Sequence, residues 1–508
     1  MIEIEARLDE LEHLGLGRRT RLVSGPQGPR VVLDGKPVLL LCSNNYLGLA
    51  DHPAVREAAA DAAMRWGVGA GASRCVSGTM TIHRRLEERI AAFSRRQAAL
   101  LFGSGYLANV GVVSALARAG DVVFSDERNQ AAIIDGCRLS RADVFIYEHG
   151  DVEHLEWGLR EAEGRGALIV TDGVFGLDGG VAPLPELVEL ANRYDVRLVV
   201  DESHGVGTLG PGGRGAVAEA GCEDGVDLIV GTLGTALGSY GAYVACDQQM
   251  ARYLVSVSRA LIHSTAPSPP GVAGALAALS LLEEQPRRVE KLQANVELLR
   301  DELAASGFEI DPGPRTPIVS LVLGDAKLAT RVCEKALDRG VFAQPLLPPQ
   351  VPDGTARLRL AVMASHSKSE LRDATRALAQ AVKAAGARPE QLRPQLHEQV
   401  GLDDDFLPAA APIAARVASA SAAAAAAPGV SGPSQPAPTR NAALWDDGDG
   451  ELWVERRAPQ PAAGRPFDGE LDRPPSRRRR ERSAVDAEAD AQGIFDAEAA
   501  GALVEHAA

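Results

Sequence analysis

The sequence contains no lysine between Lys36 and Lys291, although arginine is frequent throughout that interval. Chemistry that needs a lysine amine is therefore excluded from this long central part of the chain. The absence matters most in the segment GTLGTALGSYGAY at 231–243, whose glycines and hydroxyls are typical of a tight loop that holds a phosphate. Such a loop is expected to carry an amine at position 235, and this one has Thr235.

Metal-ligand and disulfide patterns are also missing. The six cysteines are scattered without a CxxC pair or a Cys/His ligand spacing. This predicts reduced, buried thiols in a cytoplasmic protein, with no metal site and no disulfide framework.

Long apolar runs are absent as well. The longest in the folded part, GVAGALAALSLL, is shorter than the roughly 20 residues that a membrane span needs. The acidic N-terminus has neither the basic nor the apolar region of a signal peptide. We therefore expect a cytoplasmic protein with no membrane span.

The balance of charge excludes a further class. A net charge of −15 over 508 residues, with a pI of about 5.3, argues against bulk nucleic-acid binding. The chain is too long for one small domain, and its 45% hydrophobic content is enough to form a sizeable core.

The apolar segments that are present predict an α/β fold. ALIVTDGVF, VRLVVDESHG and VDLIVGTLG are short β-branched runs that each end in a turn, as buried parallel strands do. Helical patterns such as PLPELVELANRY lie between them. Strands alternating with helices predict a mostly parallel, doubly wound sheet.

The chain divides into four predicted regions. Residues 1–50 form an N-terminal arm and segment, and 51–285 a large domain that contains the parallel sheet. Residues 286–388 form a small α+β domain, with TPIVSLVLG and ARLRLAVMA as strands. Residues 389–508 are rich in Ala, Pro, Ser and Gly and lack periodicity, which predicts a disordered tail.

Five segments hold candidate site residues. LFGSGYLAN at 101–109 is expected to direct backbone N–H groups at an anion where a strand passes into a helix. VVDESHG at 199–205 places a carboxylate and a histidine after a buried strand, where open α/β sheets bind ligands. The others are the 231–243 loop, STAPSPP at 264–270 and GTARLRLAV at 354–362, whose Arg357 and Arg359 share one face of a strand.

The order of these segments resembles that of the α-oxoamine synthases, which are fold-type-I pyridoxal phosphate (PLP) enzymes. This family includes 8-amino-7-oxononanoate synthase, 2-amino-3-ketobutyrate CoA ligase, 5-aminolevulinate synthase and serine palmitoyltransferase. The resemblance covers about residues 5 to 388. It is carried by CSNNYLGLADHP, GAGASRCVSGTMTIHRRLEERIA, FGSGYLANVGVVSAL, IIDGCRLSRA, DGVFGLDGGVAPLPEL, DESHGVGTLGPGGRG and PPQVPDGTARLRLAVMASHS. It implies a PLP-transferase large domain at 51–285.

The resemblance also implies roles for individual residues. Asp201 matches the carboxylate that keeps the cofactor ring nitrogen protonated, and His204 matches the group on the ring hydroxyl. Gly105, Tyr106 and Thr232 match the phosphate site. Arg357 matches the arginine that binds the substrate carboxylate, with Arg359 as an alternative. Ser264 and Thr265 match a contribution from a neighbouring subunit.

Around the ring, the sequence departs from the family pattern. Thr235 occupies the position of the lysine that forms an imine with the cofactor, and Gln130 occupies that of the histidine that stacks on the ring. Two serines of the pattern are replaced by Ala132 and Gly176. We therefore expect no intact catalytic residue and, at most, weak and non-covalent PLP binding.

These departures leave three functions open. The first is a degenerate, non-catalytic or partner-dependent subunit, in a homodimer or in a heterodimer with a lysine-bearing paralogue. The second is an active acyltransferase that holds its cofactor or substrate non-covalently. The third is a module that binds an acyl thioester, such as acyl-CoA or an acyl carrier protein, or a phosphate ligand. The family reaction joins an amino acid to an acyl thioester, but the sequence does not name either substrate.

Overall fold

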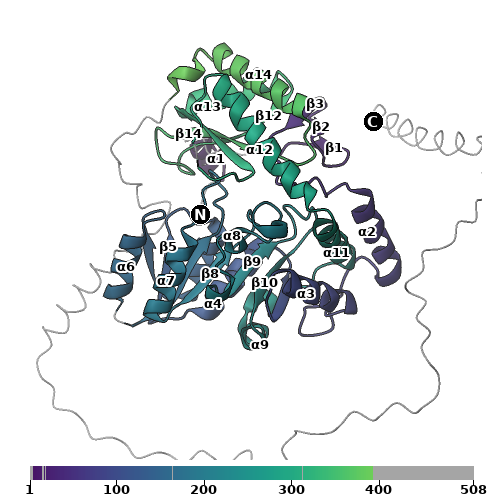
Figure 1. Ribbon diagram of the computed structural model, residues 1–508, viewed down its shortest axis with the longest axis vertical. Helices are drawn as coiled ribbons and strands as arrows, with labels where there is room; N and C mark the ends of the chain where they lie inside the picture. The colour runs from purple at the N-terminus through teal and green to yellow at the C-terminus, as the bar shows by residue number, and fades with distance from the viewer. Residues whose placement is uncertain (1–3, 14–16, 18, 163, 312, 393–508) are drawn as a thin grey trace, which may run out of the picture. The chain divides into compact units, whose positions relative to one another are not determined.

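The computed structural model describes residues 4–13, 17, 19–162, 164–311 and 313–392. Contacts divide the chain into two units, 1–427 and 428–508, and all described residues belong to the first. The predicted tail lies outside the described residues from position 393 onward. Figure 1 shows the described elements in colour.

A seven-stranded sheet forms the centre of the larger part. Its order is β4-β10-β9-β8-β7-β5-β6. The strands are β4 (Ala98–Phe102), β5 (Val122–Asp126), β6 (Asp143–Tyr147), β7 (Gly166–Asp172), β8 (Arg197–Asp201), β9 (Leu228–Thr232) and β10 (Ala242–Cys246). The pairs β5–β6, β5–β7, β7–β8 and β8–β9 are parallel, and β10 runs antiparallel to both of its neighbours. The predicted, mostly parallel α/β sheet is confirmed.

Both faces of this sheet are covered. Alternate residues of one strand enter different hydrophobic clusters: Leu100 and Phe102 pack on one face, and Leu101 on the other. Helices α4 (Gly105–Leu116), α5 (Ala131–Ser140) and α9 (Gln248–Val257) supply residues to the first face. Helices α3 (Thr81–Phe93), α6 (Val152–Glu161) and α7 (Leu184–Tyr194) supply residues to the second. Burial on both sides explains why the strands are continuous apolar runs.

The C-terminal part is built on a smaller sheet of order β11-β14-β13. Its strands are β11 (Ile318–Gly324), β13 (Gln344–Leu346) and β14 (Ala356–Ala361), and helices α12 (Arg287–Ala305), α13 (Ala326–Leu337) and α14 (Lys368–Ala384) accompany it. Helix α14 begins with a capping box between Ser367 and Glu370. This part of the chain thus contains both helices and strands, and the domain boundary at 286 stays a prediction.

The N-terminal strands join this C-terminal part. Strands β1 (Val23–Ser24), β2 (Arg30–Leu33) and β3 (Lys36–Leu40) form an antiparallel sheet, and β12 (Val341–Phe342) pairs with β3 in parallel. In Figure 1, the purple β1–β3 lie beside the green C-terminal elements. The division at residue 50 stays a prediction, but these contacts connect the first segment to residues about 300 positions away.

The remaining elements complete the described chain. They are α1 (Ile4–His13), α2 (Pro53–Trp66), α8 (Ala216–Glu219), α10 (Arg259–Ile262), α11 (Pro269–Glu284) and the 3-10 turns η1 (Pro211–Gly213), η2 (Glu223–Gly225) and η3 (Pro389–Gln391). Within the described ranges, no helix combines the length and apolar character needed to cross a membrane. All six cysteines are free, but the prediction of buried thiols is correct only for Cys137, Cys246 and Cys333, because Cys75 is exposed and Cys42 and Cys222 are partly buried. The described residues contain no cluster of metal-binding side chains.

Candidate functional site

Two carboxylates lie side by side at the carboxyl end of the large sheet. Asp172 ends β7 and Asp201 ends β8, and the strand register pairs these two residues directly. Asn109 donates a hydrogen bond from Nδ2 to Asp201 Oδ2, and the Ser203 amide donates to Oδ1 at 2.7 Å. The sheet and helix α4 thus fix the carboxylate that sequence analysis assigned to a ring nitrogen.

Burial raises the pKa of both carboxylates and is the largest cause for each. At Asp172 the charge of Asp201 adds to the increase, whereas at Asp201 the hydrogen bonds from Ser203, Asn109 and Gln130 oppose it. Gln130 opposes part of this effect, because its backbone N–H and side-chain Nε2 each donate to Asp172, at 2.9 and 2.8 Å. The pair is therefore a region of concentrated negative charge that a cationic N–H group would relieve.

The start of helix α4 lies beside two hydroxyl groups. A Cβ atom placed on Gly105 would lie 3.7 Å from Thr232 Cβ, 3.8 Å from Ser203 Oγ and 3.9 Å from Thr232 Oγ1, all ordinary contacts. Gly105 keeps a side chain away from the N-terminal end of a 12-residue helix, where N–H groups and the helix dipole favour an anion. We call this position the candidate phosphate pocket. Ser104 caps the same helix by accepting from the Leu107 amide at 3.2 Å.

Two predicted phosphate-site residues take part in different ways. Thr232 Oγ1 accepts from the Gly234 amide at 3.1 Å and donates to the Gly241 carbonyl at 3.2 Å, so the loop holds its hydroxyl beside Gly105. The Tyr106 side chain is half exposed and donates to Asp135 Oδ2 at 2.7 Å. The Tyr106 side chain therefore has a partner of its own, and its backbone N–H is the group available at the helix start.

The other side of the site is a cluster around one buried cation, Arg359, which we call the Arg359 cluster. His204 Nδ1 lies 2.8 Å from the Tyr46 hydroxyl, and burial together with the charge of Arg359 lowers the pKa of His204 to about 3. Arg359 donates from Nε to the Gly176 carbonyl at 2.6 Å and from Nη2 to Asn44 Oδ1 at 3.1 Å. The imidazole is therefore neutral near pH 7, next to a buried guanidinium.

The structure separates the two candidate arginines. Arg359 lies in the cluster with His204, whereas Arg357 donates from Nε to the carbonyl of Thr355 at 3.0 Å. The charges that act most strongly on Arg357 are those of Asp178 and Arg128, which pair with each other at 2.8 Å. The assignment of Arg357 to a substrate carboxylate remains a prediction, and the geometry favours the alternative, Arg359.

Thr235 is buried in the loop after β9. Its Oγ1 donates to the carbonyl oxygen of Ser203 at 2.8 Å, and that peptide links Ser203 to His204. Thr235 is thus bound to the peptide that joins Ser203, near Gly105, to His204, in the Arg359 cluster. Its hydroxyl is already engaged, and no lysine is close in sequence.

Gly176 leaves room for His204. A Cβ atom at position 176 would lie 2.8 Å from His204 Nε2, closer than side chains normally approach. A serine here would force the imidazole or the backbone to move. The replacement noted in the sequence is therefore coupled to the position of His204.

The segment at 264–265 lies beside the pocket of its own chain. Ser264 Oγ is 3.8 Å from where a Cβ of Gly103 would lie, and Thr265 forms a β-bridge with Ser73. These are contacts within one chain, and the contribution of Ser264 and Thr265 to a neighbouring subunit stays a prediction.

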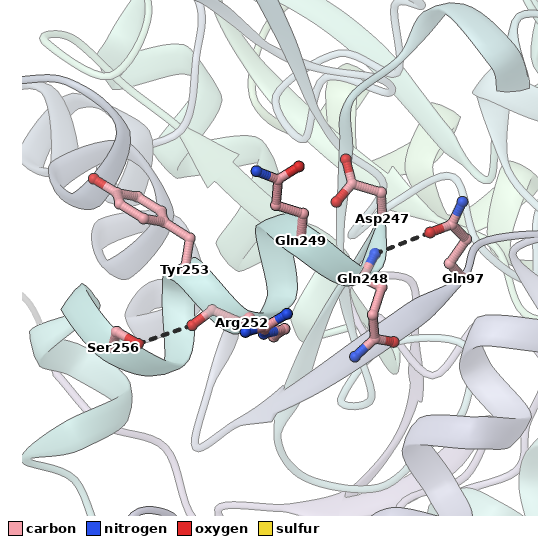
Figure 2. Close-up of a pocket in the computed structure, with 7 residues that line it drawn as sticks. All are labelled: Gln97, Asp247, Gln248, Gln249, Arg252, Tyr253 and Ser256. Atoms are coloured by element: carbon pink, nitrogen blue, oxygen red, sulfur yellow. Dashed lines mark hydrogen bonds between the residues drawn. The ribbon is translucent and has the colours of Figure 1, made fainter. Parts of the chain in front are cut away.

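A surface hollow lies elsewhere in the described part of the chain. Figure 2 shows that it is lined by Gln97, by Asp247 at the N-cap of α9 and by residues of α9, where the Gln248 amide donates to Gln97 Oε1 at 3.1 Å. Its lining contains neither the paired carboxylates nor the Gly105 pocket. We therefore assign no role to it in the candidate site.

Sequence reasoning missed several contributors. Asn44 and Tyr46 lie in the CSNNYLGLADHP motif, and their side chains contact Arg359. Asp172 and Asn109 surround Asp201. Each belongs to a segment that had been singled out, but a segment does not reveal which of its side chains faces the site.

Comparison with known proteins gives a consistent result. Residues 36–378 match the family model described as aminotransferase class I and II. The chain is 49% identical to 8-amino-7-oxononanoate synthase of Citrifermentans bemidjiense over 384 residues, which covers 74% of this chain and 98% of that one. The corresponding protein of Thermoanaerobacter pseudethanolicus is 43% identical, with coverages of 74% and 95%.

Solved structures of similar fold come from the same kinds of enzyme. A lysine-to-alanine variant of serine palmitoyltransferase from S. paucimobilis, with a bound PLP–myriocin aldimine, has a TM-score of 0.72 and 29% identity. It covers 75% of this chain and 97% of its own. An 8-amino-7-oxononanoate synthase from Francisella tularensis has a TM-score of 0.60 and 27% identity, with coverages of 68% and 98%.

Proposed function

Because the chain belongs to the aminotransferase class I and II family and, within it, to the α-oxoamine synthases, we propose that it binds PLP reversibly and acts as a partner-dependent subunit without catalysis of its own. The observation that carries this proposal is Thr235. Its buried hydroxyl donates to the Ser203 carbonyl, and the family resemblance predicts the imine-forming lysine at this position.

The residues fit the non-covalent contacts of PLP. The space at Gly105, between Thr232 and Ser203, suits a phosphate at a helix N-terminus. Asp201 is buried and fixed by Asn109, as a partner for a protonated ring nitrogen must be. When bound, PLP supplies a ring that withdraws electrons from an attached amino acid.

The residues do not fit a covalent link. Gln130 donates to Asp172, which leaves no imidazole at the predicted stacking position. Affinity would therefore come from the phosphate pocket, Asp201 and His204. Because a hydrogen bond to a charged group contributes on the order of 1.5–3 kcal/mol, we expect dissociation constants in the micromolar range or weaker.

A lysine is not indispensable for holding PLP in this fold. The lysine-to-alanine variant of the serine palmitoyltransferase relative contains PLP as an aldimine with myriocin. This supports ligand binding by a chain that lacks the lysine, and it leaves the catalytic deficit in place.

The proposed role requires a second chain. We propose a cytoplasmic homodimer, or a heterodimer with a lysine-bearing paralogue, in which an acyl-CoA or acyl carrier protein is the acyl donor. A second candidate function is an acyltransferase that uses PLP non-covalently. It is favoured by the arrangement of Asp201, His204 and Arg359, since all three are buried and held by defined partners.

An absorbance spectrum tests the main proposal. Purified protein with added PLP is expected to show no lysine imine band, and borohydride should leave the intact mass unchanged after dialysis. The second candidate function would replace the first if the protein alone, with PLP, released CoA from an acyl-CoA in the presence of an amino acid. A borohydride-stable PLP adduct on the 37–290 segment would contradict both.

A further inference from the structure

The side chain of Gln130 is turned away from the helix that it begins. Gln130 is the N-cap residue of α5, but its side chain forms no capping hydrogen bond with that helix. Its Nε2 instead donates to Asp172 Oδ1 at 2.8 Å, and its backbone N–H donates to Oδ2 at 2.9 Å. Residue 130 therefore binds both oxygens of one carboxylate and fixes its orientation.

The same side-chain amide acts on the second carboxylate. Burial raises the pKa of both Asp172 and Asp201, which are paired in the register of β7 and β8, and the Gln130 side chain opposes that increase at each. The other donors to Asp201, the Asn109 side chain and the Ser203 amide, belong to buried residues. Gln130 is only partly buried, so it is the most exposed of these three donors.

The carboxylate pair is short of donors. Within the part of the chain that the structure describes, neither carboxylate forms an ion pair with a cation, and the buried Oδ1 of Asn109 has no hydrogen-bond partner. Because buried charges and unpaired acceptors are costly, the neutral amide of Gln130 compensates only part of this cost. A cationic N–H group would compensate more of it, and it would compete with Gln130 for the same pair.

We infer that Gln130 is an internal competitor of the cofactor ring: its side-chain amide occupies the carboxylate pair and has to move aside before Asp201 can bind a ring N–H. This rests on the proposed function, because it takes PLP as the ligand and Asp201 as the partner of its ring nitrogen. The apparent affinity for PLP is then lowered by the fraction of molecules in which Gln130 holds the pair. Position 130 thus sets the strength of binding through a contact that exists without ligand.

Two substitutions separate the hydrogen bonds of Gln130 from its bulk. Gln130→Met keeps the length of the side chain without an N–H donor, and Gln130→Ala removes most of the side chain. In calorimetric titrations of the full chain, both variants should bind PLP about 10-fold more tightly than the wild type. Gln97→Met, the same substitution in the surface hollow of Figure 2, is the matched control and should leave the affinity for PLP unchanged.

A second ligand tests whether the ring nitrogen is the competing group. The 1-deaza analogue of PLP carries the phosphate but has no ring nitrogen, so it cannot donate to Asp201. The Gln130→Met substitution should therefore increase the affinity for PLP more than the affinity for the analogue. Equal gains for the two ligands, or no gain for PLP, would overturn the inference.

An NMR titration follows the competitor directly in the wild-type chain. The side-chain amide signals of Gln130, assigned by their absence from Gln130→Met, should shift as PLP saturates the protein. Unshifted signals at saturation would contradict the displacement of Gln130, and this result does not depend on the affinity of any variant. If folded wild-type and Gln130→Met proteins both failed to bind PLP at millimolar concentration, the proposed function itself would be wrong.

Discussion

The two ends of the candidate site differ in how far they keep the family pattern. At the predicted phosphate end, Gly105 begins a capped helix, with Thr232 and Ser203 beside it. At the opposite end, Thr235 donates to the Ser203 carbonyl and Gln130 donates to Asp172. The side chains at the two positions predicted to act on the ring are thus engaged in contacts within the protein.

The difference between the two ends suggests that ligand binding and catalysis depend on different kinds of groups. A phosphate pocket consists of backbone N–H groups, glycines and hydroxyls that the fold itself positions, so the fold maintains it at little cost. A lysine that forms an imine is one side chain, and its loss removes the reaction without disturbing the strands. We therefore expect that one substitution at position 235 can restore an amine, whereas damage to the phosphate end should weaken the binding of every phosphate-bearing ligand.

The largest expected effect comes from returning an amine to the loop. Thr235→Lys should create a yellow species with PLP that borohydride traps on residue 235, because the phosphate pocket and Asp201 are already in position. The measurement is the absorbance spectrum followed by peptide mapping. Thr235→Met, which adds length without an amine, is the control and should trap nothing. A colourless, correctly folded Thr235→Lys protein would show that the phosphate end no longer positions the cofactor.

Asp201 connects the two ends, so its removal should be the next largest effect. Asp201→Asn should weaken PLP binding by roughly 10- to 150-fold, the equivalent of one charge-assisted hydrogen bond. It should also lower the pKa of Asp172, because burial beside a second carboxylate raises that pKa. Calorimetry gives the affinity, and carboxyl titration by NMR gives the pKa. An unchanged affinity would place the ring away from β8.

Stability should depend on pH through the buried histidines. Burial lowers the pKa of His204 to about 3 and that of His366 to about 4, so both stay neutral in the fold while the unfolded chain protonates them near 6.5. The contribution of these two histidines to the unfolding free energy should therefore fall as pH drops from about 6.5 through about 4, by up to about 3 kcal/mol each. Asp172, Asp201 and Glu202 contribute in the opposite direction, because burial raises their pKa values. Denaturant titrations at several pH values measure this.

Two matched variants separate the contributions of the two histidines to the loss of stability at low pH. His204→Gln should reduce the dependence of the unfolding free energy on pH by the equivalent of about one proton, and it should also change ligand binding. His366→Gln should change only the pH dependence, because His366 bridges Met363 and Leu40 away from the site. Glu202 acts in the opposite direction over an overlapping pH range. Burial raises its pKa from 4.5 to about 7, so its contribution is complete below about 4.5 and is lost as pH rises through about 7. Identical pH profiles of stability for the wild type, His204→Gln and His366→Gln would contradict these assignments.

The smallest structural change tests the phosphate end alone. Gly105→Ala adds a methyl group whose distances of 3.7–3.9 Å to Thr232 and Ser203 are ordinary contacts, so the melting temperature should not fall. The same methyl group occupies the pocket, and PLP affinity should fall about tenfold or more. Thermal melting and calorimetry on one sample check both. Undiminished PLP binding would place the phosphate elsewhere.

The fold was largely predictable because its signal is local. The runs that form β7, β8 and β9 are buried on both faces, so their sequences show the pattern without knowledge of their neighbours. The pairing of β3 with β12 was not predictable, since it joins residues 39–40 to 341–342 through a two-residue contact with no sequence signature.

The site was predictable by segment and only partly by residue. Asp201 and His204 follow a recognisable strand, but Arg357 and Arg359 share one face of β14, and tertiary contacts alone separate them. The interaction of Gln130 with Asp172 was equally hidden, because it depends on which way a side chain turns after β5.

We propose that the chain binds PLP through the phosphate end and holds it without a covalent bond. A calorimetric titration of PLP into the wild-type protein tests this, with and without inorganic phosphate as competitor, followed by borohydride treatment and intact mass analysis. We expect saturable heat in the micromolar range or weaker, competition by phosphate, and an unmodified mass. A PLP adduct retained on the 37–290 segment after borohydride, or no heat at millimolar PLP, would contradict it.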